Sequence, residues 1–164
     1  MSIFKLVPLA LIAVSIAGAA MQELSWTPSD LAQIQIELEA AIKKAPVGTT
    51  SVSRQLMLEE KGKNNYVLVV HRNGSGPAEW HDSKTDMYFT LAGEGEVIVG
   101  GKMPSDQKVM DGRPGEWRGS NLVGGVPHRM VKGHVINIPP KTPHQVTVAD
   151  GKSLTFLIVK VIAP

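Results

Sequence analysis

From residue 50 onward, the chain alternates short runs of β-branched and aromatic residues with turns that contain glycine, asparagine or aspartate. The runs are 51–59, 66–71, 87–91, 96–99, 134–138, 145–148 and 154–161. The turns between them include Asn73-Gly74, Gly93-Glu94-Gly95, Gly100-Gly101, Lys132-Gly133 and Asp150-Gly151. Many short strands at close spacing, with no second helical pattern among them, predict an all-β barrel or sandwich. Residues 102–125 are polar and rich in glycine and proline, and we expect a long surface loop there.

A single amphipathic helix is expected just before these strands. Thr27 is a good helix cap, Pro28 suits the first helical position, and Asp30 favours the positive end of the helix dipole. Apolar residues then recur at helical spacing, namely Leu31, Ile34, Leu38, Ala41 and Ile42. Lysines at 43 and 44 suit the last turn, and Pro46 stops the helix. We therefore predict an N-terminal helical segment, residues 21–49, whose apolar stripe packs against the main body.

Residues 1–20 have the layout of a secretory signal peptide. A basic start that contains Lys5 is followed by an apolar stretch over residues 6–17 and then by small residues. The apolar stretch is shorter than the roughly 20 residues that span a bilayer, and Pro8 interrupts it. We expect cleavage near Ala20 or Met21, no stable membrane insertion afterwards, and a periplasmic or extracellular location. An uncleaved membrane anchor is the alternative.

Composition limits the other classes of function. The chain has 164 residues, 43% of them hydrophobic, which provides for one domain with one core. Its formal net charge is +2 without a dense cluster of lysine and arginine, which argues against nucleic acid as a partner. There are no cysteines, so thiolate metal sites, a catalytic cysteine and sulfur redox chemistry are excluded.

Side chains that ligate metals precede one of the expected strands. Glu79, His81 and Asp86 fall within eight residues. Residues two apart in a strand share a face, so Glu79 and His81 are expected to point the same way. If residues 82–85 form a tight connection, Asp86 returns close to His81. Far downstream, His144 follows an expected strand and a proline-rich turn. Histidines and carboxylates from separate strands form divalent metal sites, whereas the alternative is a solvated turn.

These residues resemble the two motifs of the cupins, which are small double-stranded β-helix (jelly-roll) barrels. The first motif is matched by Gly74, Glu79-Trp80-His81, Asp86 and Gly93, and the second by Gly133, Pro139 and His144. The chain departs from the family where Glu79 replaces a histidine, Asp86 replaces a glutamate and Lys141 replaces a glycine. The resemblance covers about residues 50–162. It implies a single-domain cupin barrel over residues 50–164 behind one N-terminal α-helix.

The resemblance also implies a divalent metal ion, with Fe, Mn, Zn and Ni as the candidates. Its ligands would be Glu79, His81, Asp86 and His144, although Glu79 could instead be the general base. The implied function is a metal-dependent enzyme of the cell envelope that acts on a small molecule as an oxidoreductase, isomerase or lyase. The alternatives are a non-catalytic module that binds a small molecule or a metal, and a barrel filled by side chains without metal. Cupins often dimerise, and residues 51–59 together with the helix are plausible contributors to a homodimer.

The remaining polar candidates are expected to have lesser roles. His71 is read as structural or as lining the rim, His134 as solvated, and His128 as a weaker candidate for facing a ligand. Tyr88 and Thr90 share the face of Asp86 and either line the cavity or fill the barrel. Lys141, at a position where the family has glycine, is expected to adopt a positive φ at a steric cost.

Overall fold

The structure is a computed structural model that describes residues 25–58, 64–110 and 113–162. Within these ranges it contains the helix α1 (Pro28–Lys44) and ten strands. The strands are β1 (Ser51–Met57), β2 (Asn65–Arg72), β3 (Ala78–His81), β4 (Lys84–Val99), β5 (Lys108–Met110), β6 (Arg113–Gly119), β7 (Val126–Val131), β8 (Val135–Ile138), β9 (His144–Thr147) and β10 (Leu154–Ile162). The expected signal peptide lies outside the described residues. Among those described, no helix has the length and apolar character needed to cross a membrane.

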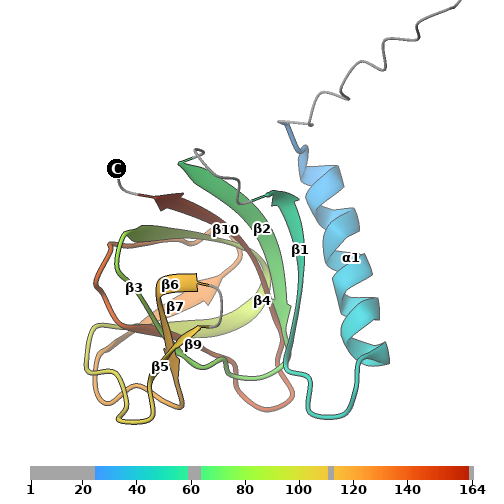
Figure 1. The fold of residues 1–164 in the computed structure, drawn as a ribbon. Helices are drawn as coiled ribbons and strands as arrows, with labels where there is room; N and C mark the ends of the chain where they lie inside the picture. The colour runs from blue at the N-terminus through green and yellow to red at the C-terminus, as the bar shows by residue number, and fades with distance from the viewer. Residues whose placement is uncertain (1–24, 59–63, 111–112, 163–164) are drawn as a thin grey trace, which may run out of the picture.

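The strands form one curled antiparallel sheet whose two halves face each other across the core (Figure 1). The hydrogen-bonded order is β1-β2-β10-β4-β9-β3-β6-β5, while β7 and β8 also pair with β4. The long strand β4 belongs to both halves, because its first part pairs with β10 and β8 and its last part pairs with β7 and β9. The prediction of an all-β barrel of the double-stranded β-helix type, preceded by one helix, is confirmed.

The helix forms and docks as its sequence predicts. Thr27 is the N-cap, and its side chain and that of Asp30 form a capping box with each other's backbone N–H groups. Ile34 and Leu38 are buried against Val69 of β2, on the outer face of the sheet. Figure 1 shows α1 lying along β1 and β2, outside the barrel. The helix thus covers one wall and leaves the barrel interior free for the site.

One sequence-based expectation about a turn is wrong. Gly93 and Gly95 lie inside β4 and not in a hairpin turn. Gly93 has a φ of +75°, it lies next to a register shift between β4 and β10, and an added Cβ would lie 2.0 Å from the Ser153 carbonyl oxygen. Glycine here therefore permits the bulge and the close approach at which β4 passes from one half of the barrel to the other.

The expected surface loop over residues 102–125 also contains two strands, β5 and β6, which close one edge of the barrel. The sequence of β6 contains arginine, proline and glycine, so its alternation of buried and exposed residues is weak. Pairing with β3 stabilises this strand. In the pairing, Trp117 lies opposite Trp80 and Glu116 lies opposite His81. Tertiary pairing overrides the local pattern in this segment.

Candidate metal centre and adjoining cavity

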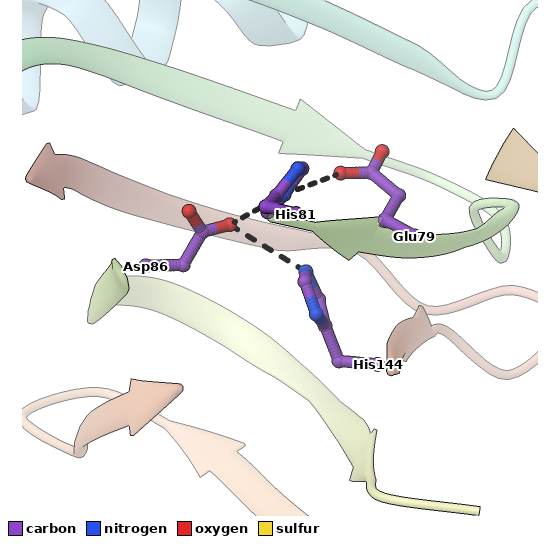
Figure 2. A group of neighbouring side chains, drawn as sticks. All are labelled: Glu79, His81, Asp86 and His144. Atoms are coloured by element: carbon purple, nitrogen blue, oxygen red, sulfur yellow. Dashed lines mark ion pairs between the residues drawn. The ribbon is translucent and has the colours of Figure 1, made fainter. Parts of the chain in front are cut away.

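The barrel interior brings together all four side chains that the sequence singles out. Glu79, His81, Asp86 and His144 each offer one ligand atom, and these atoms all lie within 4.8 Å of one another. Figure 2 shows the four side chains pointing towards a common centre from β3, β4 and β9. His81, Asp86 and His144 have side chains no more than 3% exposed, and Glu79 is 14% exposed. The arrangement is a candidate metal centre.

Strand register explains why residues so far apart in sequence meet. Glu79 and His144 are direct partners on the antiparallel strands β3 and β9. His81 lies two residues after Glu79 on the same face, and only two residues separate β3 from β4, which carries Asp86. The Lys141 N–H donates to the His81 carbonyl oxygen at 2.7 Å, which ties the proline-rich turn to the end of β3. Lys141 has the expected positive φ, 60°.

The imidazole of His144 is oriented for ligation. Its Nδ1 atom lies 3.0 Å from the Thr142 carbonyl oxygen, so this nitrogen carries the proton and donates it. Its Nε2 atom is buried, has no hydrogen-bond partner among the described residues, and lies 3.5 Å from Asp86 Oδ2. A backbone carbonyl that fixes the tautomer in this way leaves the opposite nitrogen with a free lone pair, as in many metal-binding histidines.

Asp86 is the most deeply buried member of the group, with no exposed side-chain surface. Burial by itself raises its pKa, but the adjacent imidazoles of His144 and His81 and the charge of Lys160 together hold the pKa well below its usual range. Tyr88 donates from its hydroxyl to Asp86 Oδ2 at 3.1 Å, and burial raises the pKa of that phenol well above its usual range. Asp86 is therefore an ionised carboxylate held by neutral and cationic donors.

Lys160 is the functional residue that sequence reasoning missed. Its Nζ atom lies 2.6 Å from both carboxylate oxygens of Asp86 and 2.9 Å from His81 Nε2. Its side chain is only 8% exposed. A sequence signal existed, because Lys160 continues the inward-facing alternation of Phe156 and Ile158 on the last strand, where a charged residue is unexpected.

Glu79 lies at the boundary between the candidate centre and the adjoining cavity. Its carboxylate lies 2.9 Å from Arg118 Nη2 and 3.7 Å from His81 Nε2. Burial is the largest single influence on its pKa and raises it, but the charges of Lys160 and Arg118, with smaller contributions from the histidines, lower the pKa overall. Glu79 is thus ionised and partly accessible, as either a ligand or a general base requires.

A cavity of about 150 Å³ opens beside the four residues. Its wall includes Glu79, Tyr88, His144 and Lys160, so a molecule in the cavity would touch the candidate centre directly. The volume is below the roughly 300 Å³ at which pockets for drug-sized ligands begin. The cavity therefore has room for a small molecule only.

The other histidines lie apart from this group. His71 is buried on β2 and its Nδ1 atom lies 2.8 Å from Thr155 Oγ1, which makes it a structural residue. His128 and His134 are exposed, and His134 Nδ1 lies 3.0 Å from the Arg129 carbonyl oxygen. The expectation of a structural His71 and a solvated His134 is confirmed, and the exposed His128 does not face the candidate centre.

Comparison with solved structures identifies the fold. The protein TT1209 from Thermus thermophilus matches with a TM-score of 0.50 and 15% identity over 75% of this chain and 95% of that protein. Other matching structures are described as a cupin domain, a cupin-2 domain or a protein with a double-stranded β-helix domain. The strand pairing of this chain itself makes a double-stranded β-helix barrel. No protein-family model and no curated protein sequence matches it.

Two further matches to the cupin barrel are named enzymes. The polyketide cyclase RemF from Streptomyces resistomycificus has 18% identity and a TM-score of 0.47, over 69% of this chain and 66% of that protein. The DMSP lyase DddQ from Ruegeria pomeroyi DSS-3 has 20% identity and a TM-score of 0.48, over 71% of this chain. This chain covers about half of the length of DddQ, namely 49%. At these identities the comparisons give the fold alone.

Proposed function

We propose that this cupin binds a divalent cation through Glu79, His81, Asp86 and His144 and acts on a small molecule held in the adjoining cavity. The observation that carries the proposal is the convergence of four ligand atoms within 4.8 Å of one another inside the barrel. Two imidazoles and two carboxylates are a donor set that Mn, Fe, Ni and Zn all accept.

The atoms of the candidate centre fit a cation in two respects. His144 Nε2 is buried without a hydrogen-bond partner among the described residues, and a cation would supply the missing partner. The two carboxylates are ionised, as their lowered pKa values indicate, and their two charges balance those of a divalent ion. The ammonium of Lys160 now occupies the space between Asp86 and His81, so it has to withdraw when a cation binds.

The chain's own residues define what the site does with a ligand. A bound divalent cation would act as a Lewis acid on an oxygen of the ligand. Where Glu79 is the general base and not a ligand, its ionised carboxylate faces the cavity and accepts a proton from the bound molecule, while Arg118 holds that carboxylate in place at 2.9 Å. Tyr88 and Lys160 fix Asp86. The buried surroundings exclude bulk water, which strengthens each of these electrostatic interactions.

Metal content tests the proposal directly. Protein purified without an affinity tag is analysed for bound metal and then titrated with Mn²⁺ and Zn²⁺ after treatment with a chelator. We expect one cation per chain, and we expect H81A and H144A each to lose it. The matched control is H128A, which removes an exposed histidine outside the candidate centre and should bind as the unchanged protein does. Unchanged metal binding in H81A and H144A would end the proposal.

The position of Lys160 favours a second candidate, a metal-free cupin that binds a small molecule without metal chemistry. The Nζ atom lies 2.6 Å from both oxygens of Asp86, where it supplies the positive charge that a cation otherwise brings. On this alternative the unchanged protein shows no binding of Mn²⁺ or Zn²⁺, while a small molecule still raises its melting temperature.

We further propose that the mature protein works outside the cytoplasm, on the pattern of a basic start, an apolar stretch and small residues in residues 1–20. Mass spectrometry of the N-terminus after expression from the full-length gene tests this proposal. The expected product begins near Ala20 or Met21 and appears in the exported fraction. A homodimer remains part of the proposal, with light scattering of the purified protein as its test.

A further inference from the structure

We propose that the cavity binds a small oxyanion of the carboxylate type, with the partly buried Arg72 as its counter-charge. The inference rests on the proposed function in taking this cavity as the ligand site, but it does not require the cation. It names the chemical class of ligand that the barrel accepts.

Arg72 is the last residue of β2 and continues that strand's inward-facing row of Tyr66, Leu68 and Val70 into the cavity wall. Its Nε atom is buried and has no hydrogen-bond partner among the described residues. Burial is the main influence that lowers the pKa of its guanidinium, and the charge of Glu79 opposes it. A guanidinium stays protonated in proteins, so a buried donor of this kind calls for an acceptor.

Gly76 makes room for this guanidinium. A Cβ added at Gly76 would lie 2.7 Å from Arg72 Cζ and Nη1 and 2.8 Å from Nη2. The backbone at Gly76 is fixed as well, since its N–H donates to the Val146 carbonyl oxygen and its own carbonyl accepts from Gln145 Nε2. Any side chain at residue 76 would displace the guanidinium. The segment between β2 and β3 thus sets where the positive charge lies.

The charges around the cavity leave it positive. The cationic residues in its wall are Arg72, Arg113, Arg118 and Lys160, against the carboxylates Glu79 and Glu116. Each of these carboxylates already has a cation close by, because Arg118 pairs with Glu79 and Lys84 pairs with Glu116. Lys160 is engaged by Asp86. Arg113 at the mouth lies 3.8 Å from Glu116, so Arg72 is the cation of the cavity wall that has no ion pair among the described residues.

Geometry and size narrow the ligand further. The planar fork of a guanidinium matches the two oxygens of a carboxylate or a phosphate in a bidentate pair. A cavity of about 150 Å³ excludes a large anion such as a nucleotide. An anion bound at Arg72 would lie in the same cavity as Glu79 and His144, so its neighbouring atoms would face the candidate centre. The ligand class is a compact carboxylate, and a small phosphate shares the same chemistry.

Calorimetric titration with malonate, inorganic phosphate and malonamide tests the inference. Malonamide has nearly the shape of malonate without its charge. The full chain is first measured after treatment with a chelator and then again with saturating Mn²⁺. Three variants accompany it, namely R72M, G76A and R54M. R54M is the matched control, because Arg54 is 51% exposed and pairs with Glu37 of α1, outside the barrel.

We expect malonate to bind and malonamide not to bind. We expect R72M to weaken malonate binding by about 30-fold, the loss that follows removal of one partner from a buried charge pair. G76A, which keeps every charge, should also weaken it because it displaces the guanidinium, and R54M should leave it unchanged. Stronger binding of phosphate than of malonate would assign a phosphoryl group to the ligand within the same oxyanion class.

Any one of three results would overturn the inference. Malonate and malonamide could bind equally, neither malonate nor phosphate could bind, or both R72M and G76A could bind malonate as the unchanged protein does. Metal binding is read separately in the same samples. If the unchanged protein binds malonate but not Mn²⁺, only the proposed metal centre is contradicted. If it binds Mn²⁺ but not malonate, only the oxyanion site is contradicted. Far-ultraviolet circular dichroism of each variant confirms that the barrel is folded when the titration is made.

Discussion

Lys160 and Asp86 lie directly opposite each other on β10 and β4, and Lys160 Nζ lies 2.6 Å from both carboxylate oxygens of Asp86. The ammonium also lies 2.9 Å from His81 Nε2. The barrel therefore contains its own cation at the place where the donor set of the candidate centre converges. Whatever divalent ion the site accepts has to compete with this charge.

Replacing Lys160 with methionine should increase the affinity for divalent cations. Two unit charges about 4 Å apart interact by about 4 kcal/mol at an effective dielectric constant of about 20. Removal of the ammonium should therefore strengthen Mn²⁺ or Zn²⁺ binding by at least about tenfold. Methionine keeps most of the length of the side chain and removes its charge, and calorimetric titration measures the change. Equal or weaker binding in K160M would show that the ammonium does not compete with the cation.

K160M also separates the two candidate functions. If K160M binds a cation that the unchanged protein refuses, Lys160 replaces the metal in the native barrel, which is the metal-free candidate. If both proteins bind, the metal-dependent candidate holds and Lys160 sets the affinity. The matched control is K152M, since Lys152 is 56% exposed and pairs with Glu94 outside the candidate centre. K152M should leave cation binding unchanged.

The pairing of Lys160 with Asp86 should also be visible in the stability of the metal-free protein. D86N leaves a buried ammonium without its counter-charge, which typically costs about 3 kcal/mol or more. In the double variant D86N/K160M both charges are gone, so we expect it to be more stable than D86N alone. Urea unfolding of the four proteins in a double-mutant cycle gives the coupling energy. Simple additivity of the two single effects would contradict the pairing.

The parts of this protein that the sequence predicts correctly depend on local signals. The helix cap at Thr27, the stripe through Ile34 and Leu38, and the stop before Pro46 are all read within one short segment. The four side chains of the candidate centre could also be predicted, because alternation fixes the shared face of Glu79 and His81. The short link between β3 and β4 indicates that Asp86 lies close to them, and the cupin-like spacing of the second motif indicates His144.

What could not be predicted depends on contacts between distant segments. Lys160 is 74 residues from Asp86 in sequence, and only the pairing of β10 with β4 makes them neighbours. The strand β6 lacks a clear alternation and forms because β3 lies beside it. In the sequence, Arg72 is only a polar residue at the end of a strand. In the structure, its guanidinium lies against Gly76 and in the wall of the cavity. The boundaries at residues 20, 49 and 50 and the signal peptide stay predictions.

Replacing Lys141 with glycine should stabilise the barrel. Lys141 has a φ of 60°, a left-handed conformation that costs a residue with a Cβ about 1–2 kcal/mol. Glycine removes that cost but adds roughly 0.5–1 kcal/mol of backbone entropy in the unfolded chain. We expect a net gain of about 0.5 kcal/mol in the free energy of unfolding, the difference between these two terms.

The gain from K141G should appear in urea unfolding without loss of metal binding, because the backbone hydrogen bond from residue 141 to His81 does not involve the side chain. K141A is the control, since alanine carries the same Cβ and should bring no gain. A lower stability for K141G than for the unchanged protein would show that the lysine side chain contributes more than its conformation costs.

His71 should make the stability of the fold depend on pH below neutrality. Burial lowers its pKa from the ordinary value of 6.5, and the opposing charge of Glu39 is a smaller influence. The unfolded chain therefore takes up this proton at a higher pH than the folded protein does. The stability is fully present above pH 6.5 and is lost as the pH falls through the lowered pKa, by at most about 1.4 kcal/mol per pH unit for one proton.

H71Q removes the titrating group while keeping a polar side chain opposite Thr155, whose Oγ1 lies 2.8 Å from His71 Nδ1. The free energy of unfolding of H71Q should therefore decline less steeply than that of the unchanged protein as the pH falls from 6.5 to about 5, measured by urea unfolding at each pH. T155V keeps the imidazole and removes the hydroxyl, so its decline should remain. Parallel pH profiles for H71Q and the unchanged protein would show that the imidazole of His71 is not held neutral by its burial beneath α1.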